Sequence, residues 1–163
     1  MTCVIVADND VLIRGLLRSL LEGAGQTVIL ASCGEEVMAF ASQVRASLIL
    51  LDLNMPRMNG FVTCERLRRL PGYGNTPIVI LSAHNGERER HAAAKVGMTL
   101  FIAKPFQPAV LLQALSPYLD IDVRAQKAIS HGATRAREIA PLVGSVIERG
   151  SGYTERDGFR APL

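Results

Sequence analysis

The sequence predicts an α/β fold, a (βα)5 arrangement in which helices wind over both faces of one parallel five-stranded sheet. Five short runs rich in Val, Ile and Leu occur in the first 103 residues, and segments with helical spacing separate them. Runs that are apolar throughout are typical of parallel strands buried on both faces. Because βαβ crossovers are right-handed, the helices are expected on both faces of the sheet, which makes the fold doubly wound.

The expected strands share a length of five residues and a β-branched or leucine-rich composition. They are Cys3–Ala7, Thr27–Ala31, Ser47–Leu51, Pro77–Leu81 and Thr99–Ala103. The periodicity leaves the order of the strands in the sheet open. It does place the carboxyl ends of all five strands at one edge, which is where open α/β sheets carry their functional residues.

Between these runs, apolar residues recur every three or four positions and stop at glycine or proline. Pro108 is well suited to the first turn of the last helix. The expected helices carry Leu12, Leu16 and Leu20, ending by Gly25; Val37, Phe40, Ala41 and Val44; Phe61, Cys64, Leu67 and Leu70; His91 to Val96; and about Pro108 to Leu119.

Composition narrows the class of protein. The chain has 163 residues, of which 48% are hydrophobic and 20% charged, a size and balance that suit one globular domain with an appendage. No apolar run approaches the roughly 18 residues of a membrane helix, and no basic region precedes the first apolar stretch, so we expect a cytoplasmic protein without membrane contact. Three widely spaced cysteines indicate neither a disulfide framework nor a zinc site.

The last 41 residues differ from the rest in charge. Residues 1–122 hold 11 basic and 11 acidic residues, whereas residues 123–163 hold 7 and 4, so the net charge of +3 lies in the tail. Apolar residues fall loosely at helical spacing between Val123 and Arg149, with Gly and Pro interrupting them. We expect one or two short amphipathic helices there, and a mobile end from about Ser151.

Candidate functional residues follow four of the five expected strands. Asp8, Asn9 and Asp10 follow the first, Asp52 the third, Ser82 the fourth and Lys104 the fifth. Converging carboxylates repel one another unless a cation neutralises them, and oxygen ligands favour a hard ion such as Mg²⁺. A lysine and a hydroxyl beside them suit the oxygens of a phosphoryl group. Together these groups indicate a phosphoryl-transfer site.

The same residues carry a resemblance to a known family. The order Asp8-Asn9-Asp10, Asp52-Leu53-Asn54-Met55-Pro56, Ser82-Ala83 and Lys104-Pro105-Phe106 resembles the receiver domain of two-component response regulators, whose fold is CheY-like and flavodoxin-like. The resemblance covers about residues 1–120, which we assign to a receiver domain. Residues 121–163 are then a C-terminal helical extension.

The resemblance implies a role for each matching residue. Asp52 is the phosphoacceptor, and Asp8, Asn9, Asp52 and the backbone carbonyl of Asn54 are the Mg²⁺ ligands. Ser82 is the switch hydroxyl, Lys104 its ionic partner and Phe101 the aromatic that follows Ser82. The peptide bond before Pro105 is cis. For Ser82 a purely backbone-satisfying role, and for Phe101 plain core packing, remain open.

Asn9 departs from the pattern of the family, in which two adjacent acids follow the first strand. An amide oxygen can ligate Mg²⁺ but brings no charge, so weaker Mg²⁺ binding and slower phosphorylation are expected. Asp10 could compensate by turning inward, although capping the helix that begins at Val11 is the favoured role for an aspartate there.

The resemblance implies a stand-alone response regulator and a signalling protein rather than an enzyme. Asp52 would be phosphorylated by a histidine kinase or phosphotransfer protein, and a changed surface would then bind a partner protein or a second copy as a homodimer. Three net positive charges and the lack of a recognisable reading helix make DNA binding unlikely. Two alternatives stay open: a degenerate receiver that binds proteins without phosphorylation, and a haloacid-dehalogenase-like phosphatase with Asp8 as nucleophile and Asp10 as acid.

Overall fold

The computed structural model describes residues 3–119 and 147–149 of the chain. Strands and helices alternate through the first of these ranges. The elements are β1 (Cys3–Ala7), α1 (Val11–Gly23), β2 (Thr27–Ala31), α2 (Gly34–Gln43), β3 (Leu48–Asp52), α3 (Gly60–Arg69), β4 (Ile78–Ser82), α4 (Glu87–Lys95), β5 (Leu100–Ala103), α5 (Pro108–Leu115), the 3-10 helix η1 (Ser116–Tyr118) and β6 (Ile147–Arg149).

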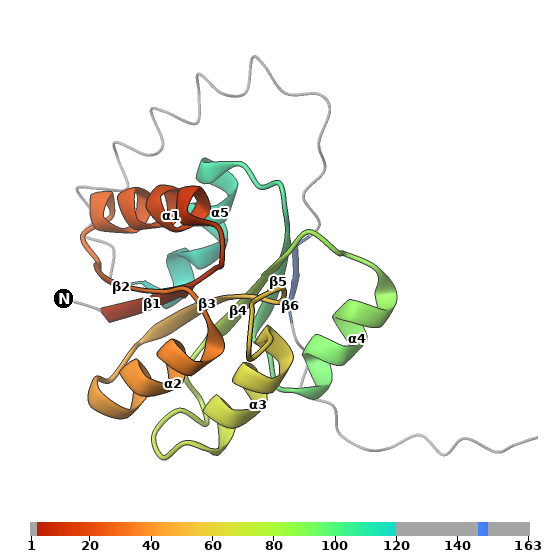
Figure 1. Cartoon of the computed structure of the whole chain (residues 1–163). Coiled ribbons are helices and arrows are strands. Elements are labelled where there is room, and N and C mark those ends of the chain that lie inside the picture. The colour runs from red at the N-terminus through yellow and green to blue at the C-terminus, as the bar shows by residue number, and fades with distance from the viewer. Residues whose placement is uncertain (1–2, 120–146, 150–163) are drawn as a thin grey trace, which may run out of the picture.

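One sheet forms the centre of the molecule, with strand order β2-β1-β3-β4-β5-β6. The first five strands pair in parallel, which confirms the expected (βα)5 fold. Helices α1 and α5 lie over one face of the sheet, and α2, α3 and α4 lie over the other (Figure 1). The two faces of each central strand are therefore both covered, as continuous apolar runs require.

The elements fall close to their expected positions. Strands β3, β4 and β5 each begin one residue later than the apolar runs predict. Helix α4 begins at Glu87, four residues before His91, because its first turn is polar and leaves no apolar signal. None of the described helices is long and apolar enough to cross a membrane.

The C-terminal extension contains a strand where helical spacing was expected. Residues Ile147–Arg149 pair antiparallel with β5, so the expectation of helical structure between Val123 and Arg149 is wrong at these three positions. Backbone pairing with an apolar strand outweighs the weak helical pattern of this segment. The remaining expected helices of the extension, and its end from Ser151, lie outside the described residues.

Two apolar clusters, one on each face, hold the helices on the sheet. On one face, Val37 of α2, Cys64 and Leu67 of α3 and Ala93 of α4 pack against the sheet. On the other, Leu17 and Leu21 of α1 pack with Leu111 and Leu115 of α5. Full burial of a leucine contributes about 1.5–3 kcal/mol, so these clusters fix the strands rigidly beneath the carboxyl edge.

Candidate functional site

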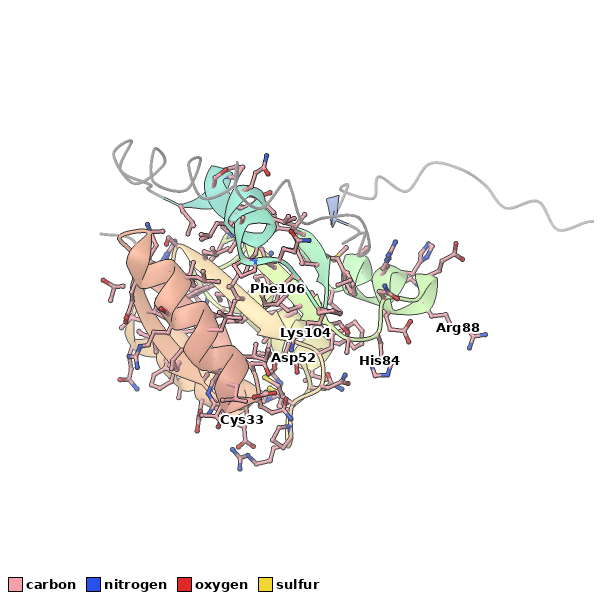
Figure 2. All side chains as sticks on the ribbon, turned by 90° about the horizontal axis from the view of Figure 1, so that it is seen from above. Cys33, Asp52, His84, Arg88, Lys104 and Phe106 are labelled. Carbon is pink, nitrogen blue, oxygen red and sulfur yellow. The ribbon has the colours of Figure 1, made fainter. Side chains whose placement is uncertain are left out.

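Asp8, Asp52 and Lys104 meet at the carboxyl edge of the sheet. The Lys104 Nζ lies 2.5 Å from Asp8 Oδ2 and 3.1 Å from Asp52 Oδ1. Asp8 is fully buried, Asp52 is 3% exposed, and the Lys104 side chain is 16% exposed. Figure 2 shows Asp52 and Lys104 side by side near the middle of the molecule, seen from above. The structure therefore brings together three of the residues that the sequence placed at this edge.

Strand register explains why these side chains meet. Ala7 of β1 pairs with Leu51 of β3, so Asp8 and Asp52 each follow at the same level of neighbouring strands. Lys104 directly follows β5, and its amide donates to the Ser82 carbonyl at 2.8 Å. The Lys104–Pro105 peptide bond is cis, the isomer that the resemblance implied.

Burial dominates the electrostatics of Asp52. It raises the pKa of this carboxyl above its ordinary value of 3.8, and the neighbouring Asp8 adds to the rise. The Lys104 cation and its hydrogen bond oppose both effects without cancelling them. Two carboxylates thus share one cation, and the site favours the addition of further positive charge.

Asp8 and Asp10 have different tasks. The Asp8 Oδ1 accepts a hydrogen bond from the Asp10 amide at 2.9 Å, and its backbone carbonyl accepts one from Arg14 at 2.6 Å. Asp10 caps helix α1 by accepting from the Leu12 amide at 2.8 Å. Asp10 is thus the cap residue that its position favoured, and it is exposed, as is Asn9.

The loop between β3 and α3 passes very close to the phosphoacceptor candidate. The Gly60 amide donates to the Leu53 carbonyl at 3.0 Å. A Cβ atom at position 60 would lie 2.4 Å from the Asp52 carbonyl oxygen and 2.9 Å from the Leu53 Cα. Only glycine fits this approach of helix α3 to the end of β3.

Replacing Gly60 with alanine should therefore disturb the site and destabilise the domain. We expect a loss of about 1–3 kcal/mol in the free energy of unfolding, because the Cβ atom meets backbone that cannot rotate away. Urea unfolding measures the effect. Gly15→Ala in helix α1 is the matched control, since nothing lies within 4 Å of its Cβ position. It should stabilise by about 0.5–1 kcal/mol. Equal stability of the two variants would contradict the close approach.

Arg57 ties the same loop to helix α2. Its φ angle is 64°, in the left-handed region, which is uncommon for a residue with a side chain. Arg57 Nε lies 3.1 Å from the Glu35 Oε2, and Nη2 donates to the Cys33 sulfur at 2.8 Å. These two contacts hold the exposed loop against the neighbouring βα turn.

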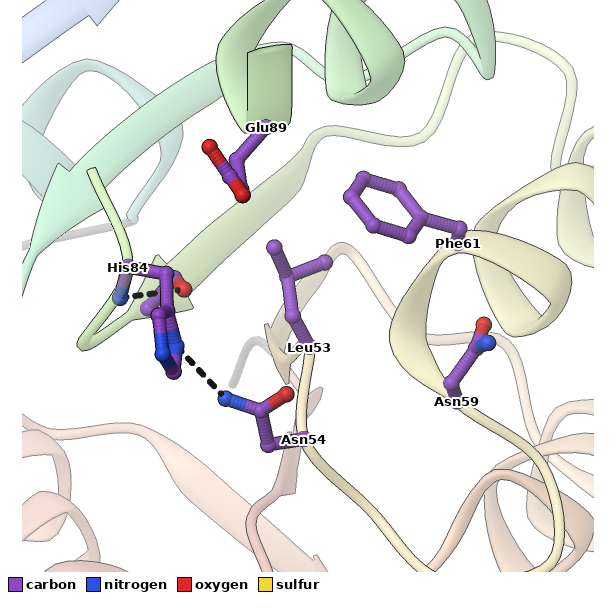
Figure 3. Close-up of a pocket in the computed structure, with 7 residues that line it drawn as sticks. Leu53, Asn54, Asn59, Phe61, His84 and Glu89 are labelled. Atoms are coloured by element: carbon purple, nitrogen blue, oxygen red, sulfur yellow. Dashed lines mark hydrogen bonds between the residues drawn. The ribbon is translucent and has the colours of Figure 1, made fainter. Parts of the chain in front are cut away.

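A pocket of about 310 Å³ opens beside the site, lined by Leu53, Asn54, Asn59, Phe61, Ser82, His84 and Glu89. Its lining comes from the β3–α3 loop and the start of α3, from the end of β4 and the β4–α4 loop, and from helix α4 (Figure 3). The Asn54 Nδ2 lies 3.2 Å from the His84 Nδ1 and links the β3–α3 loop to the β4–α4 loop. Two of its lining residues, Leu53 and Asn54, directly follow Asp52 in the chain.

Ser82 and Phe101 lie deeper in the fold. The Ser82 hydroxyl is fully buried and accepts from the His84 amide at 3.1 Å, so it does satisfy backbone. Phe101 is also fully buried and belongs to the apolar cluster beneath α2, α3 and α4. The Arg90 guanidinium lies 5.9 Å from the centroid of its ring. Both residues thus have structural contacts, and their switching roles stay predictions.

Three contacts near the site were not foreseen from the sequence: those of Arg14, Arg57 and His84. The Arg14 contact could have been found, because a residue one turn into α1 reaches the end of β1. The contacts of Arg57 and His84 join different loops, and no periodicity reports them.

The site fits a hard cation in its chemistry. In the residues that the structure describes, no three His, Cys, Asp or Glu side chains gather as a metal site. The expected ligand set does not need three, since it combines the carboxylates of Asp8 and Asp52 with neutral oxygens of Asn9 and Asn54. Lys104 balances the charge of only one of the two buried carboxylates, Asp8 and Asp52, so one negative charge is left for Mg²⁺ to balance.

A doubly wound parallel sheet with a buried aspartate pair and a lysine at its carboxyl edge defines the class of CheY-like signalling domains. The chain belongs to the family described as the response regulator receiver domain, whose sequence model matches residues 4–116. It is therefore a receiver domain of two-component systems.

Proteins similar to this chain support the family assignment, and they differ from one another in total length. A chemotaxis protein of Vibrio cholerae, CheY4, has 34% sequence identity and a TM-score of 0.70, covering 73% of this chain and 99% of its own. An uncharacterised 14.6 kDa protein of Leptolyngbya boryana is 32% identical over 115 residues, 71% of this chain and 88% of its own. The cyclic di-GMP phosphodiesterase response regulator RpfG of Xanthomonas campestris is 26% identical over 90% of this chain, which spans only 39% of that protein.

Proposed function

We propose that this chain is a response regulator that accepts a phosphoryl group on Asp52 from a histidine kinase or phosphotransfer protein. The cluster of Asp52, Asp8 and Lys104 at the carboxyl edge carries the proposal. Asp52 is the acid of this cluster that heads the β3–α3 loop, and the next two residues of that loop line the neighbouring pocket. We further propose that the protein is a cytoplasmic signalling domain and not a turnover enzyme.

The proposed reaction transfers a phosphoryl group from a histidine nitrogen of the donor to Asp52. A carboxylate oxygen of Asp52 attacks the phosphorus, and the bond from phosphorus to the donor nitrogen breaks. The electron pair of that bond leaves with the imidazole of the donor, which takes up a proton. Lys104 balances negative charge on the phosphoryl oxygens, and the Ser82 hydroxyl is a donor for one of them.

A bound Mg²⁺ would add charge neutralisation to this site. Asp8, Asp52 and the Asn54 backbone carbonyl would hold it, with the Asn9 amide oxygen as a neutral ligand. Asn9 is exposed directly after Asp8, so its side chain can turn toward the site without disturbing the core. The chain's own residues thus supply two acidic ligands where acid-paired receivers supply three.

Asn9→Asp should strengthen Mg²⁺ binding and accelerate phosphorylation by a small donor. A third carboxylate adds Coulomb attraction for the ion, and we expect a gain of about tenfold in affinity, equivalent to about 1.4 kcal/mol. Calorimetric titration with Mg²⁺ and the initial rate with acetyl phosphate measure the two effects. Asn59→Asp, on the rim of the neighbouring pocket, is the control and should change either quantity far less. Unchanged affinity and rate in Asn9→Asp would remove Asn9 from the ligand set.

Intact-protein mass spectrometry tests the phosphoacceptor. After incubation with acetyl phosphate and Mg²⁺, the chain should gain the mass of one phosphoryl group, and Asp52→Asn should gain none. A missing adduct, when a control receiver is labelled, would favour a degenerate receiver that binds proteins without phosphorylation. Steady turnover of a generic phosphomonoester that survives Asp52→Asn and is lost in Asp8→Asn would instead favour the haloacid-dehalogenase-like phosphatase.

The proposed output is a changed protein-binding surface on α4, β5 and α5. Phosphorylation would draw Ser82 toward the phosphoryl group and alter packing around Phe101, shifting the population of surface states. The surface would bind a partner protein or a second copy of the chain. The division of the chain near residue 120 into a receiver domain and a C-terminal extension is part of the same proposal.

A further inference from the structure

Strand β6 occupies the outer edge of β5. The register pairs Leu100 with Arg149, Phe101 with Glu148 and Ile102 with Ile147, in antiparallel orientation. In the sheet order, β5 would otherwise be the last strand. Figure 1 shows β6 beside β5, on the side of the sheet from which α4 projects. A segment from the end of the chain therefore reaches the surface proposed for output.

The peptide groups of β5 show which positions β6 contacts. The Lys104 amide donates to the Ser82 carbonyl of β4. The backbone N–H and C=O groups of successive residues in a strand point to opposite sides. The groups of Ile102, two residues before Lys104, therefore also face β4, and the groups of Phe101 face β6. The pair of Phe101 and Glu148 is then the central hydrogen-bonded pair of this short antiparallel ladder.

The composition of β5 makes an uncovered edge unfavourable. Its sequence, Leu-Phe-Ile-Ala, contains neither a charged residue nor proline, and all four residues are buried. An apolar edge strand with open N–H and C=O groups is a template for any extended segment. Such an edge is the feature that partner proteins use when they add a strand to a sheet.

We propose that the edge of β5 is a strand-docking site whose occupant is the chain's own C-terminal strand, and that docked β6 excludes other extended segments from this edge. The connection from Leu119 to Ile147 is covalent, so docking of β6 is intramolecular and favoured over an equal segment in solution. β6 pairs over only three residues, which keeps the docked strand replaceable.

The meaning of this edge for output depends on the proposed function, whereas the docking itself does not. The test therefore uses the unphosphorylated full chain, so that its failure leaves the phosphoacceptor proposal intact. Conversely, a missing phosphoryl adduct on Asp52 would leave the docking of β6 untouched.

Amide hydrogen exchange followed by NMR tests the docking. Glu148→Pro removes the N–H that faces Phe101, and the Phe101 amide should then exchange at least about tenfold faster. The Ile102 amide faces β4 and should be unchanged. Glu148→Thr keeps the N–H and a strand-forming side chain, so the Phe101 amide of this variant should exchange at the wild-type rate. If proline accelerates Ile102 as well, the milder Glu148→Gly should accelerate Phe101 alone.

Adding the strand back in trans completes the test. A synthetic peptide of residues 144–152, Gly-Ser-Val-Ile-Glu-Arg-Gly-Ser-Gly, at roughly millimolar concentration should restore protection of the Phe101 amide in Glu148→Pro. It should have no effect on Glu148→Thr, whose edge is occupied. Wild-type exchange at Phe101 in both Glu148→Pro and Glu148→Gly, or a peptide that restores nothing, would overturn the proposal.

Discussion

Lys104→Met should lower the free energy of unfolding by about 3–5 kcal/mol at neutral pH, the largest loss we expect from a single change at the site. The Lys104 side chain is 16% exposed and contacts two carboxylates that are almost fully buried. Methionine fills a similar volume but leaves both acids without their cation. Removing one member of a buried charged cluster costs much more than the cluster contributes, because the remaining charges are uncompensated.

The loss in Lys104→Met should depend on pH in a defined direction. Burial already raises the pKa of Asp52, and Lys104 opposes that rise, so the variant raises this pKa further. A carboxyl with a raised pKa in the folded state destabilises the fold once it ionises. The difference from the wild type should therefore be complete at neutral pH and shrink as the pH falls through the raised pKa. Chemical unfolding at several pH values measures it.

Mg²⁺ and a second lysine make the experiment specific. A divalent ion bound between the acids should replace part of the missing charge, so added Mg²⁺ should narrow the gap between Lys104→Met and the wild type. Lys95→Met, at an exposed position in α4, should change stability by less than about 0.5 kcal/mol. Equal losses in the two variants, at every pH, would show that the ion pairs of Lys104 contribute little.

The sequence predicted the fold well because parallel strands buried on both faces leave an unambiguous signal. Val4 to Ala7 and Leu48 to Leu51 are apolar without interruption, and all eight residues are buried in the sheet. The C-terminal strand left no such signal, since a three-residue ladder depends on a partner strand more than 40 residues away. Nonlocal pairing of this kind is decided by the partner and not by local propensity.

The candidate site was predictable where one strand end determines a position. Asp8, Asp52, Ser82 and Lys104 each lie directly after or at the end of a strand, and parallel register brings such ends to one level. The bridge from Asn54 to His84 was not predictable, because it depends on the conformations of two loops. Burial of the acids, which sets the pKa of Asp52, likewise requires the packed structure.

Asp52→Asn should lose the phosphoryl adduct completely and yet stabilise the folded chain at neutral pH. The raised pKa of Asp52 means that the ionised carboxylate is less favourable in the folded protein than in the unfolded chain. Asparagine has the shape of the neutral acid without its charge. We expect a gain on the order of 1 kcal/mol, typical of replacing a functional group whose environment serves activity at the expense of stability.

The pH dependence identifies the cause of that gain. Because the pKa of Asp52 is raised in the folded state, the folded protein binds more protons than the unfolded chain from about its ordinary value of 3.8 up to the raised value. Wild-type stability contributed by this group therefore falls as the pH rises through that window, whereas Asp52→Asn has no such loss. The gain should be present above the window and vanish below it, in urea unfolding at each pH. Glu65→Gln, at an exposed helix position, should show no comparable change.

A gain in stability of Asp52→Asn that persists unchanged below the window would instead indicate better packing of the amide. Mg²⁺ should stabilise the wild type more than this variant, because only the wild type retains both acids.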